Sequence, residues 1–137
     1  MRRALRIFGN EIYYGVKTVE LVPSPPSGRS LPLGRLIAPG HIVLYDQPRS
    51  PWRLGAPVVA KRREGLQRAG AQIDDAGVIS WPGDTLRRFM LGNVLAHELG
   101  HHVLQHERRL RGARGARTRE HEARAEAIAA QLRALLE

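Results

Sequence analysis

The chain has 137 residues, of which 42% are hydrophobic and 26% are charged, and it contains no cysteine. This composition is that of an ordinary globular protein, and the length suits one domain spanning residues 1–137. The lack of cysteine excludes disulfides and thiolate metal sites. No run of 18 apolar residues is present, so we expect no membrane span and no membrane partner. The arginine-rich start lacks the long apolar core of a signal peptide, and we expect a cytoplasmic location.

The chain is strongly basic, with a formal net charge of +9. Such an excess can attract nucleic acid. Aromatic residues make up only 5% of the chain, which is few for stacking on bases, and no nucleic-acid-binding motif is visible. We therefore do not expect a nucleic-acid partner. A basic, nucleic-acid-associated protein in which zinc is structural remains the alternative that the charge supports.

The first half of the chain reads as short strands separated by turns. Residues 2–14 fit either a short helix or a strand broken at Gly9. Alternating β-branched residues, with a proline-rich loop at residues 23–28 and a turn signal at Pro39-Gly40, predict strands farther on. These predicted strands cover residues 16–22, 33–37 and 41–45. The last two should form a hairpin.

The second half favours helices. Residues 47–57 are rich in proline and arginine, and we expect an irregular surface segment there that includes Trp52. Apolar spacing predicts helices over residues 58–69, over residues 84 to about 111 with Asp84 as N-cap, and over residues 118–136 with Thr118 as N-cap. An arginine-rich loop at residues 108–117 should connect the last two. Residues 72–73 and 78–81 should form a hairpin or one late strand. The elements therefore predict an α+β fold.

The most informative stretch is His97-Glu98-Leu99-Gly100-His101, which matches the H-E-x-x-H pattern of zinc peptidases. Residues four apart on a helix share a face, so His97 and His101 can bind one zinc ion. Glu98 lies about 100° round the helix from His97, so it does not join them as a ligand. It can reach a water on the open side of the metal and act as general base.

A catalytic zinc usually has a third protein ligand. A histidine six residues after His101 would define one known class, but Glu107 occupies that position. The better source is the predicted last helix, where spacing alone leaves four residues open as ligands. They are Glu120, His121, Glu122 and Glu126. Small residues one turn farther on, such as Ala125 and Ala129, would let this helix approach the first closely enough to share an ion.

Two stretches of the chain resemble the gluzincins, which are zinc peptidases whose third ligand is a Glu on a later helix. These stretches are LAHELGHHVL at residues 95–104 and EARAEAIAAQL at residues 122–132. The resemblance spans roughly residues 78–136 and is closest to the small intracellular ImmA/IrrE-type peptidases. Glu126 stands where Asn or Asp is usual in that family, and Ile128 where Phe is usual. The resemblance implies Glu122 as third metal ligand and Glu98 as catalytic base.

The resemblance also implies a zincin-like fold, in which a small, mostly antiparallel sheet packs on the active-site helix and on a second ligand helix. An edge strand of that sheet would hold an extended peptide by backbone hydrogen bonds. Residues 42–45 and 78–81 are our candidates for that edge, with ordinary sheet interior as the equal alternative. A donor should also stabilise the oxyanion formed during hydrolysis. The candidates, among which the sequence does not choose, are Tyr45, His102, His121 and Arg124.

We therefore expect a zinc-dependent metalloendopeptidase acting on a protein or peptide substrate. An alternative within the same family is a regulatory peptidase or binding module that acts on one transcriptional repressor. For His102 and His106 a second interpretation is simpler than catalysis, namely that both are polar residues on the solvent side of the helix. His121 would bear on the structural-zinc alternative if it occupied a fourth ligand position, because structural zinc has four protein ligands.

Overall fold

The computed structural model describes residues 1–24, 32–38, 40–110 and 119–137, and it combines helices with two small sheets. The helices are α1 (Arg2–Phe8), α2 (Asn10–Tyr13), α3 (Ala56–Arg68), α4 (Thr85–Phe89), the π-helical segment η1 (Met90–Leu95), α5 (Ala96–Leu110) and α6 (Arg119–Ala134). The strands are β1 (Thr18–Val22), β2 (Gly34–Ala38), β3 (His41–Tyr45), β4 (Trp52–Arg53), β5 (Gln72–Ile73) and β6 (Val78–Ser80). The α+β prediction is confirmed, and residues 2–14 are helical rather than extended.

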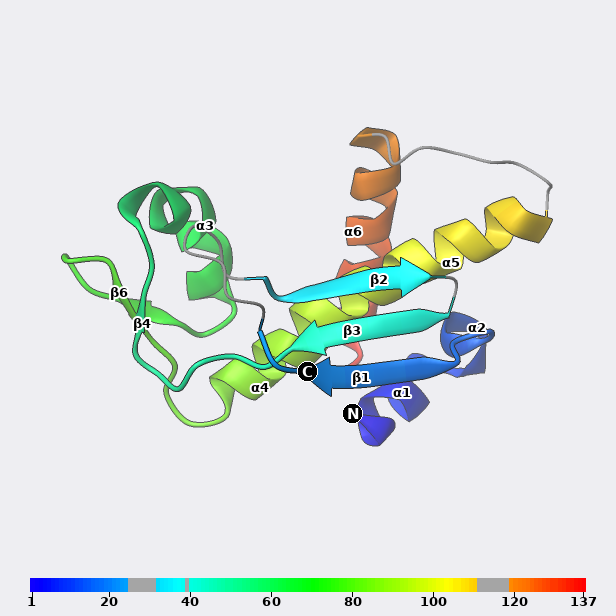
Figure 1. The fold of residues 1–137 in the computed structure, drawn as a ribbon, viewed down its shortest axis with the longest axis horizontal. Coiled ribbons are helices and arrows are strands. Elements are labelled where there is room, and N and C mark those ends of the chain that lie inside the picture. The colour runs from blue at the N-terminus through cyan, green and yellow to red at the C-terminus, as the bar shows by residue number, and fades with distance from the viewer. Residues whose placement is uncertain (25–31, 39, 111–118) are drawn as a thin grey trace.

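The larger sheet has the strand order β1-β3-β2 and lies in front of α5 in Figure 1. The predicted hairpin is confirmed, because β2 pairs antiparallel with β3. Gly40 makes its turn at φ 81°, a conformation that glycine adopts without steric cost. The strand pairings are mostly antiparallel, as predicted, and the exception is β1, which pairs parallel with β3. A parallel partner requires a longer connection than a hairpin turn, and residues 23–40, which include β2, separate β1 from β3.

The smaller sheet has the order β4-β6-β5, and both of its pairings are antiparallel. The predicted hairpin of residues 72–73 and 78–81 is confirmed. The prediction that residues 47–57 are irregular and lie on the surface is partly wrong. Trp52 begins β4, is only 2% exposed and packs against Trp81 with ring centroids 5.1 Å apart. Burying both indole rings anchors this sheet to the core.

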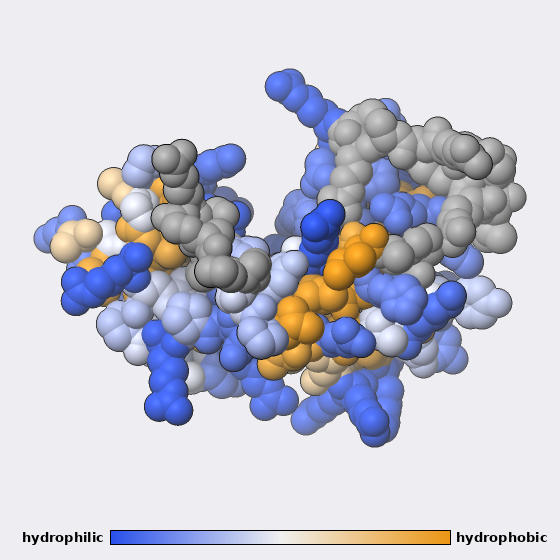
Figure 2. Space-filling model, in the orientation of Figure 1, coloured by the Kyte–Doolittle hydropathy of each residue, from blue (hydrophilic) through white to orange (hydrophobic). Residues whose placement is uncertain are grey.

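Neither strand expected to hold a peptide is an edge strand. Residues 42–45 belong to β3 and residues 78–80 to β6, and each of these strands is the middle one of its sheet. Both edges of each strand therefore form backbone hydrogen bonds within the sheet. The edge strands of the larger sheet are β1 and β2, which carry the exposed apolar side chains Leu21 and Ile37. Figure 2 shows apolar residues gathered over this sheet on a mostly hydrophilic face.

The predicted active-site helix is a continuous run made of α4, η1 and α5. Asp84 precedes it but does not cap it through its side chain; the carboxylate instead accepts a hydrogen bond from Arg88 Nε at 3.2 Å. Within η1, the N–H of Ala96 bonds to Leu91 O, five residues back, which marks a π turn. The helix extends to Leu110, so it takes the first residues of the predicted connecting loop. The rest of that loop, and Thr118, lie outside the described residues.

Helices α5 and α6 pack closely, with α6 crossing behind α5 in Figure 1. The contact depends on Gly100, because a Cβ atom there would lie 2.5 Å from Ala125 O. Ala125 and Ala129 are fully buried on the facing side of α6. The predicted role of small residues is therefore met on both helices. None of the described helices is long and apolar enough to cross a lipid bilayer.

Candidate metal centre

Three predicted ligands meet where α5 and α6 face each other. The imidazole Nε2 atoms of His97 and His101 lie 3.0 Å apart. Glu122 Oε2 lies 3.5 Å from each of these nitrogens. Two nitrogens from adjacent turns of α5 and one oxygen from α6 thus form a small triangle.

The triangle has the dimensions of a zinc site. Tetrahedral zinc with bonds of about 2.0–2.1 Å places its ligand atoms about 3.3 Å from one another. The three separations in this group, 3.0, 3.5 and 3.5 Å, lie on both sides of that value. Two imidazoles and one carboxylate are also a donor set that catalytic zinc uses. The separations and the donor set are therefore compatible with a zinc ion held by these three residues.

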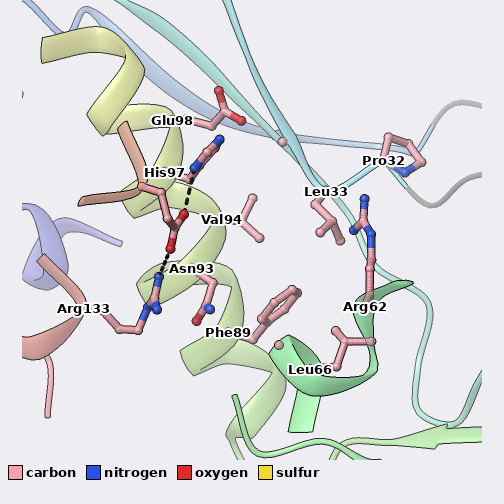
Figure 3. A pocket seen from close by; sticks show the side chains of 13 residues that line it. Pro32, Leu33, Arg62, Leu66, Phe89, Asn93, Val94, His97, Glu98 and Arg133 are labelled. Carbon is pink, nitrogen blue, oxygen red and sulfur yellow. Dashed lines mark hydrogen bonds and ion pairs between the residues drawn. The ribbon is translucent and has the colours of Figure 1, made fainter. Parts of the chain in front are cut away.

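His97 is oriented by a carboxylate on its far side. Its Nδ1 donates to Glu126 Oε2 at 3.2 Å, so the lone pair of Nε2 faces the other ligand atoms. Arg133 NH2 donates to the other oxygen of Glu126 at 2.9 Å, and Arg133 Nε donates to Gly92 O at 3.1 Å. Figure 3 shows this chain of contacts from Arg133 to His97. Glu126 therefore makes a hydrogen bond to His97 although it is longer than the Asn or Asp usual in the peptidases that the sequence resembles.

His101 is oriented by a second histidine. Its Nδ1 lies 3.0 Å from His121 Nε2, and both rings are buried, with exposed fractions of 1% and 2%. The two rings are stacked, with their planes 13° apart. With Nδ1 of His101 donating to His121, the Nε2 lone pair points toward Glu122. His121 thus contacts the far nitrogen of a ligand and is not a member of the three-atom group.

Glu98 and His97 line a cavity of about 520 Å³, and the carboxylate residue is 8% exposed. The cavity lies between the start of β2, helix α3 and the run from α4 to α5, with Glu126 and Arg133 at its α6 side. In Figure 3, Arg62 rises from α3 on one side of the cavity and His97 from α5 on the other. Glu98 thus lies on the wall of the same cavity as His97, one of the three residues of the triangle.

The other candidates lie elsewhere. Glu120 is exposed on α6 and is not in the metal group. The four oxyanion candidates, Tyr45, His102, His121 and Arg124, are absent from the cavity lining. Arg124 pairs at 3.8 Å with Glu107.

The solvent-side interpretation of His102 is wrong, because the residue is 3% exposed and its Nε2 lies 2.8 Å from Tyr14 O. Partly buried His106 packs edge-on against the Tyr14 ring, with centroids 5.6 Å apart. Both histidines therefore attach the N-terminal helices to α5. Sequence reasoning missed Arg133, whose position seven residues after Glu126 on a predicted helix was the available signal.

Comparisons with protein-family models, curated proteins and solved structures return no match for this chain. The arrangement of its own side chains is therefore what supports a function.

Proposed function

We propose that this chain is a zinc-dependent metalloendopeptidase with a zincin-like fold. The observation that carries the proposal is the triangle of His97 Nε2, His101 Nε2 and Glu122 Oε2, with Glu98 beside it on the wall of a cavity. Two histidines from one helix and a glutamate from a later helix are the ligand set that the gluzincin resemblance implies. Glu126 and His121 support these ligands from behind.

His97, His101 and Glu122 would hold the zinc ion. Zinc supplies Lewis acidity, which polarises a carbonyl and lowers the pKa of a coordinated water to about 7. Glu98 accepts a proton from the attacking water and returns it to the departing amine, so the peptide bond is hydrolysed with no net change in the enzyme. Glu98 is 8% exposed, so its carboxylate lies in a site of restricted access to bulk water.

A peptide substrate would bind along the open edge of β2. The N–H of Tyr45 donates to Leu33 O at 3.0 Å, so Leu33 faces β3. Backbone groups alternate in an antiparallel pair, and Gly34 and Leu36 therefore turn theirs away from β3. This edge adjoins the cavity, because Leu33 and Gly34 line it together with His97 and Glu98. An added strand would gain backbone hydrogen bonds there.

The three-ligand group favours catalysis over a structural role for zinc. Structural zinc takes four protein ligands, whereas a catalytic site keeps one position for water or substrate. Within the described part of the chain, the group consists of His97, His101 and Glu122, and His121 contacts the far side of His101.

The substrate is a protein or peptide of unspecified sequence, and a transcriptional repressor is the regulatory alternative. A cytoplasmic location remains a prediction.

The test is a cleavage assay with zinc-loaded protein, using unfolded casein and a mixture of peptides whose products are identified by mass spectrometry. We expect internal cleavage that a chelator abolishes and that zinc restores. Glu98→Gln should be inactive in the same assay. Failure of every substrate to be cut by protein that carries zinc would contradict the endopeptidase proposal.

A further inference from the structure

The cavity beside the metal centre has an uneven distribution of charge. Its α6 side holds Glu126 and Arg133, which neutralise each other through a contact of 2.9 Å. On the opposite side stands Arg62, exposed on α3, which forms no ion pair with any of the described residues. The guanidinium of Arg62 is therefore a positive charge without an ion pair among the described residues, on the cavity wall across from His97.

Between these charged sides most of the wall is apolar, with Asn93 as a polar exception. Leu33 comes from the chain before β2, Leu66 from α3, and Phe89 and Val94 from the helical run that leads into α5 (Figure 3). Leu66 and Phe89 are buried in the protein core, so this part of the wall is held in place by packing. A side chain that enters here meets methylene and aromatic surface first and Arg62 beside it.

Gly65 leaves room for such a side chain. It lies in the interior of α3, three residues after Arg62 and so on the same helix face, and it lines the cavity. A Cβ atom at this position would meet nothing within 4 Å. Neither packing nor backbone conformation therefore requires glycine there, although glycine weakens a helix interior. What the missing side chain provides is open space in the cavity.

We propose that this cavity is a side-chain subsite that selects an acidic residue of the substrate, with Arg62 pairing the carboxylate and Gly65 leaving space for the chain that carries it. A glutamate suits the subsite, because its methylene groups can lie on Leu66 and Phe89 while its carboxylate reaches Arg62. A lysine at the same position would meet a like charge. The inference rests on the proposed peptidase function, since it places a substrate along the β2 edge.

The size of the preference follows from the exposure of Arg62. An ion pair at an exposed site changes the binding affinity by up to about fivefold. Replacing the attractive Glu with a repelled Lys increases the difference in affinity between the two peptides. We expect peptides with glutamate at the selected position to bind about three- to tenfold more tightly than peptides with lysine there, with glutamine between them. Added salt should reduce the difference, because the pair is exposed to solvent.

The experiment measures binding without cleavage. Fluorescently labelled peptides that carry Glu, Gln or Lys at each position in turn are titrated into zinc-loaded Glu98→Gln protein and followed by anisotropy. Arg62→Glu in the same background should reverse the order of the Glu and Lys peptides. Lys61→Glu is the matched control, because it makes the same charge change on the neighbouring residue of α3, which does not line the cavity. It should leave the order unchanged.

A second variant tests the space rather than the charge. Gly65→Leu should fold, since leucine has a higher helix propensity than glycine, and should keep its zinc. We expect it to weaken binding of the Glu peptide at least fivefold, with a smaller loss for Gly65→Ala.

The outcomes separate the inference from the proposed function. In one outcome the parent protein cleaves peptides, while Arg62→Glu leaves the order of peptide affinities unchanged and Gly65→Leu leaves the affinity for the Glu peptide unchanged. This result would overturn the subsite but not the peptidase function. If both variants change peptide binding as expected but the parent protein cleaves no peptide, the subsite is supported and the peptidase function is contradicted. No binding of any peptide to zinc-loaded protein would overturn the subsite.

Discussion

His97 donates from Nδ1 to Glu126 Oε2, and this contact joins the first ligand helix to the second. The donation fixes which nitrogen of His97 faces the metal group. Removing such a supporting carboxylate typically weakens metal binding by about 10–100-fold. We expect Glu126→Ala to show a loss of this size in a zinc competition titration. Arg124→Ala, on the same helix but away from His97, is the control and should bind zinc as the parent does.

Glu122 should matter more than its neighbours, because its carboxylate oxygen is one of the three proposed ligand atoms. Glu122→Gln removes the only negative charge among the ligands, and we expect the largest loss of zinc affinity of any single glutamate on α6. Glu120→Gln makes the same chemical change at an exposed position and should have little effect. Elemental analysis should find about one zinc per chain in the parent. Loss of zinc from Glu120→Gln but not from Glu122→Gln would refute the assignment of the third ligand.

His121 tests the support of the other histidine. His121→Leu keeps a side chain of similar bulk but cannot accept the hydrogen bond from His101. We expect zinc affinity to fall about 10–100-fold and the metal-free protein to lose about 1–3 kcal/mol of stability, because a buried polar group loses its partner. Chemical denaturation with and without zinc measures both effects. His106→Leu on the opposite part of α5 should leave zinc affinity unchanged, and an equal loss in both variants would mean that the effect is not specific to His101.

The sequence could predict that His97 and His101 lie together because this depends on helical spacing alone, whereas spacing left four residues of the last helix open and only the gluzincin resemblance implied Glu122. His97 and His101 share a face whatever the rest of the chain does, and alternation predicted β2 and β3 in nearly their observed bounds. The order of strands within a sheet depends on long-range pairing, so the sequence could not choose between edge and interior for β3 and β6, which are both interior strands. Burial of Trp52 and His102 likewise depends on partners far away in the chain, namely Trp81 and Tyr14. Local composition does not indicate which distant residues pack against a given side chain.

The role of Glu98 should be separable from metal binding. It lines the cavity beside the ligand triangle without being one of the three ligands. Glu98→Gln keeps the shape of the side chain but cannot take a proton from water at neutral pH. We expect the variant to retain zinc and to lose about 10²–10⁴-fold in the rate of peptide hydrolysis. A variant that loses its zinc would mean that Glu98 helps to build the metal site.

Gly100 should be needed for the close packing of α5 on α6, since a Cβ atom there would clash with Ala125 O. We expect Gly100→Ala to cost about 1–3 kcal/mol in urea denaturation, as overpacking does, and to weaken zinc binding by moving Glu122 away from the histidines. Gly65→Ala is the matched control. Because the space around its Cβ is open, Gly65→Ala should stabilise the protein by about 0.5–1 kcal/mol. An increase in stability in Gly100→Ala as well would disprove the close contact.

The π turn of η1 has a consequence for how the chain tolerates length changes. It accommodates one more residue between Phe89 and His97 than an α-helix would, and each residue of a helix advances the face by about 100°. Deleting one residue here, for instance Leu91, would let an uninterrupted α-helix form that keeps His97 and His101 close to their present phase with Phe89. An α-helix with the present number of residues would instead turn the His97 and His101 pair about 100° away, so that either the aromatic anchor or the pair would face the wrong neighbours. The irregular turn sets the rotational phase between the protein core and the proposed metal centre.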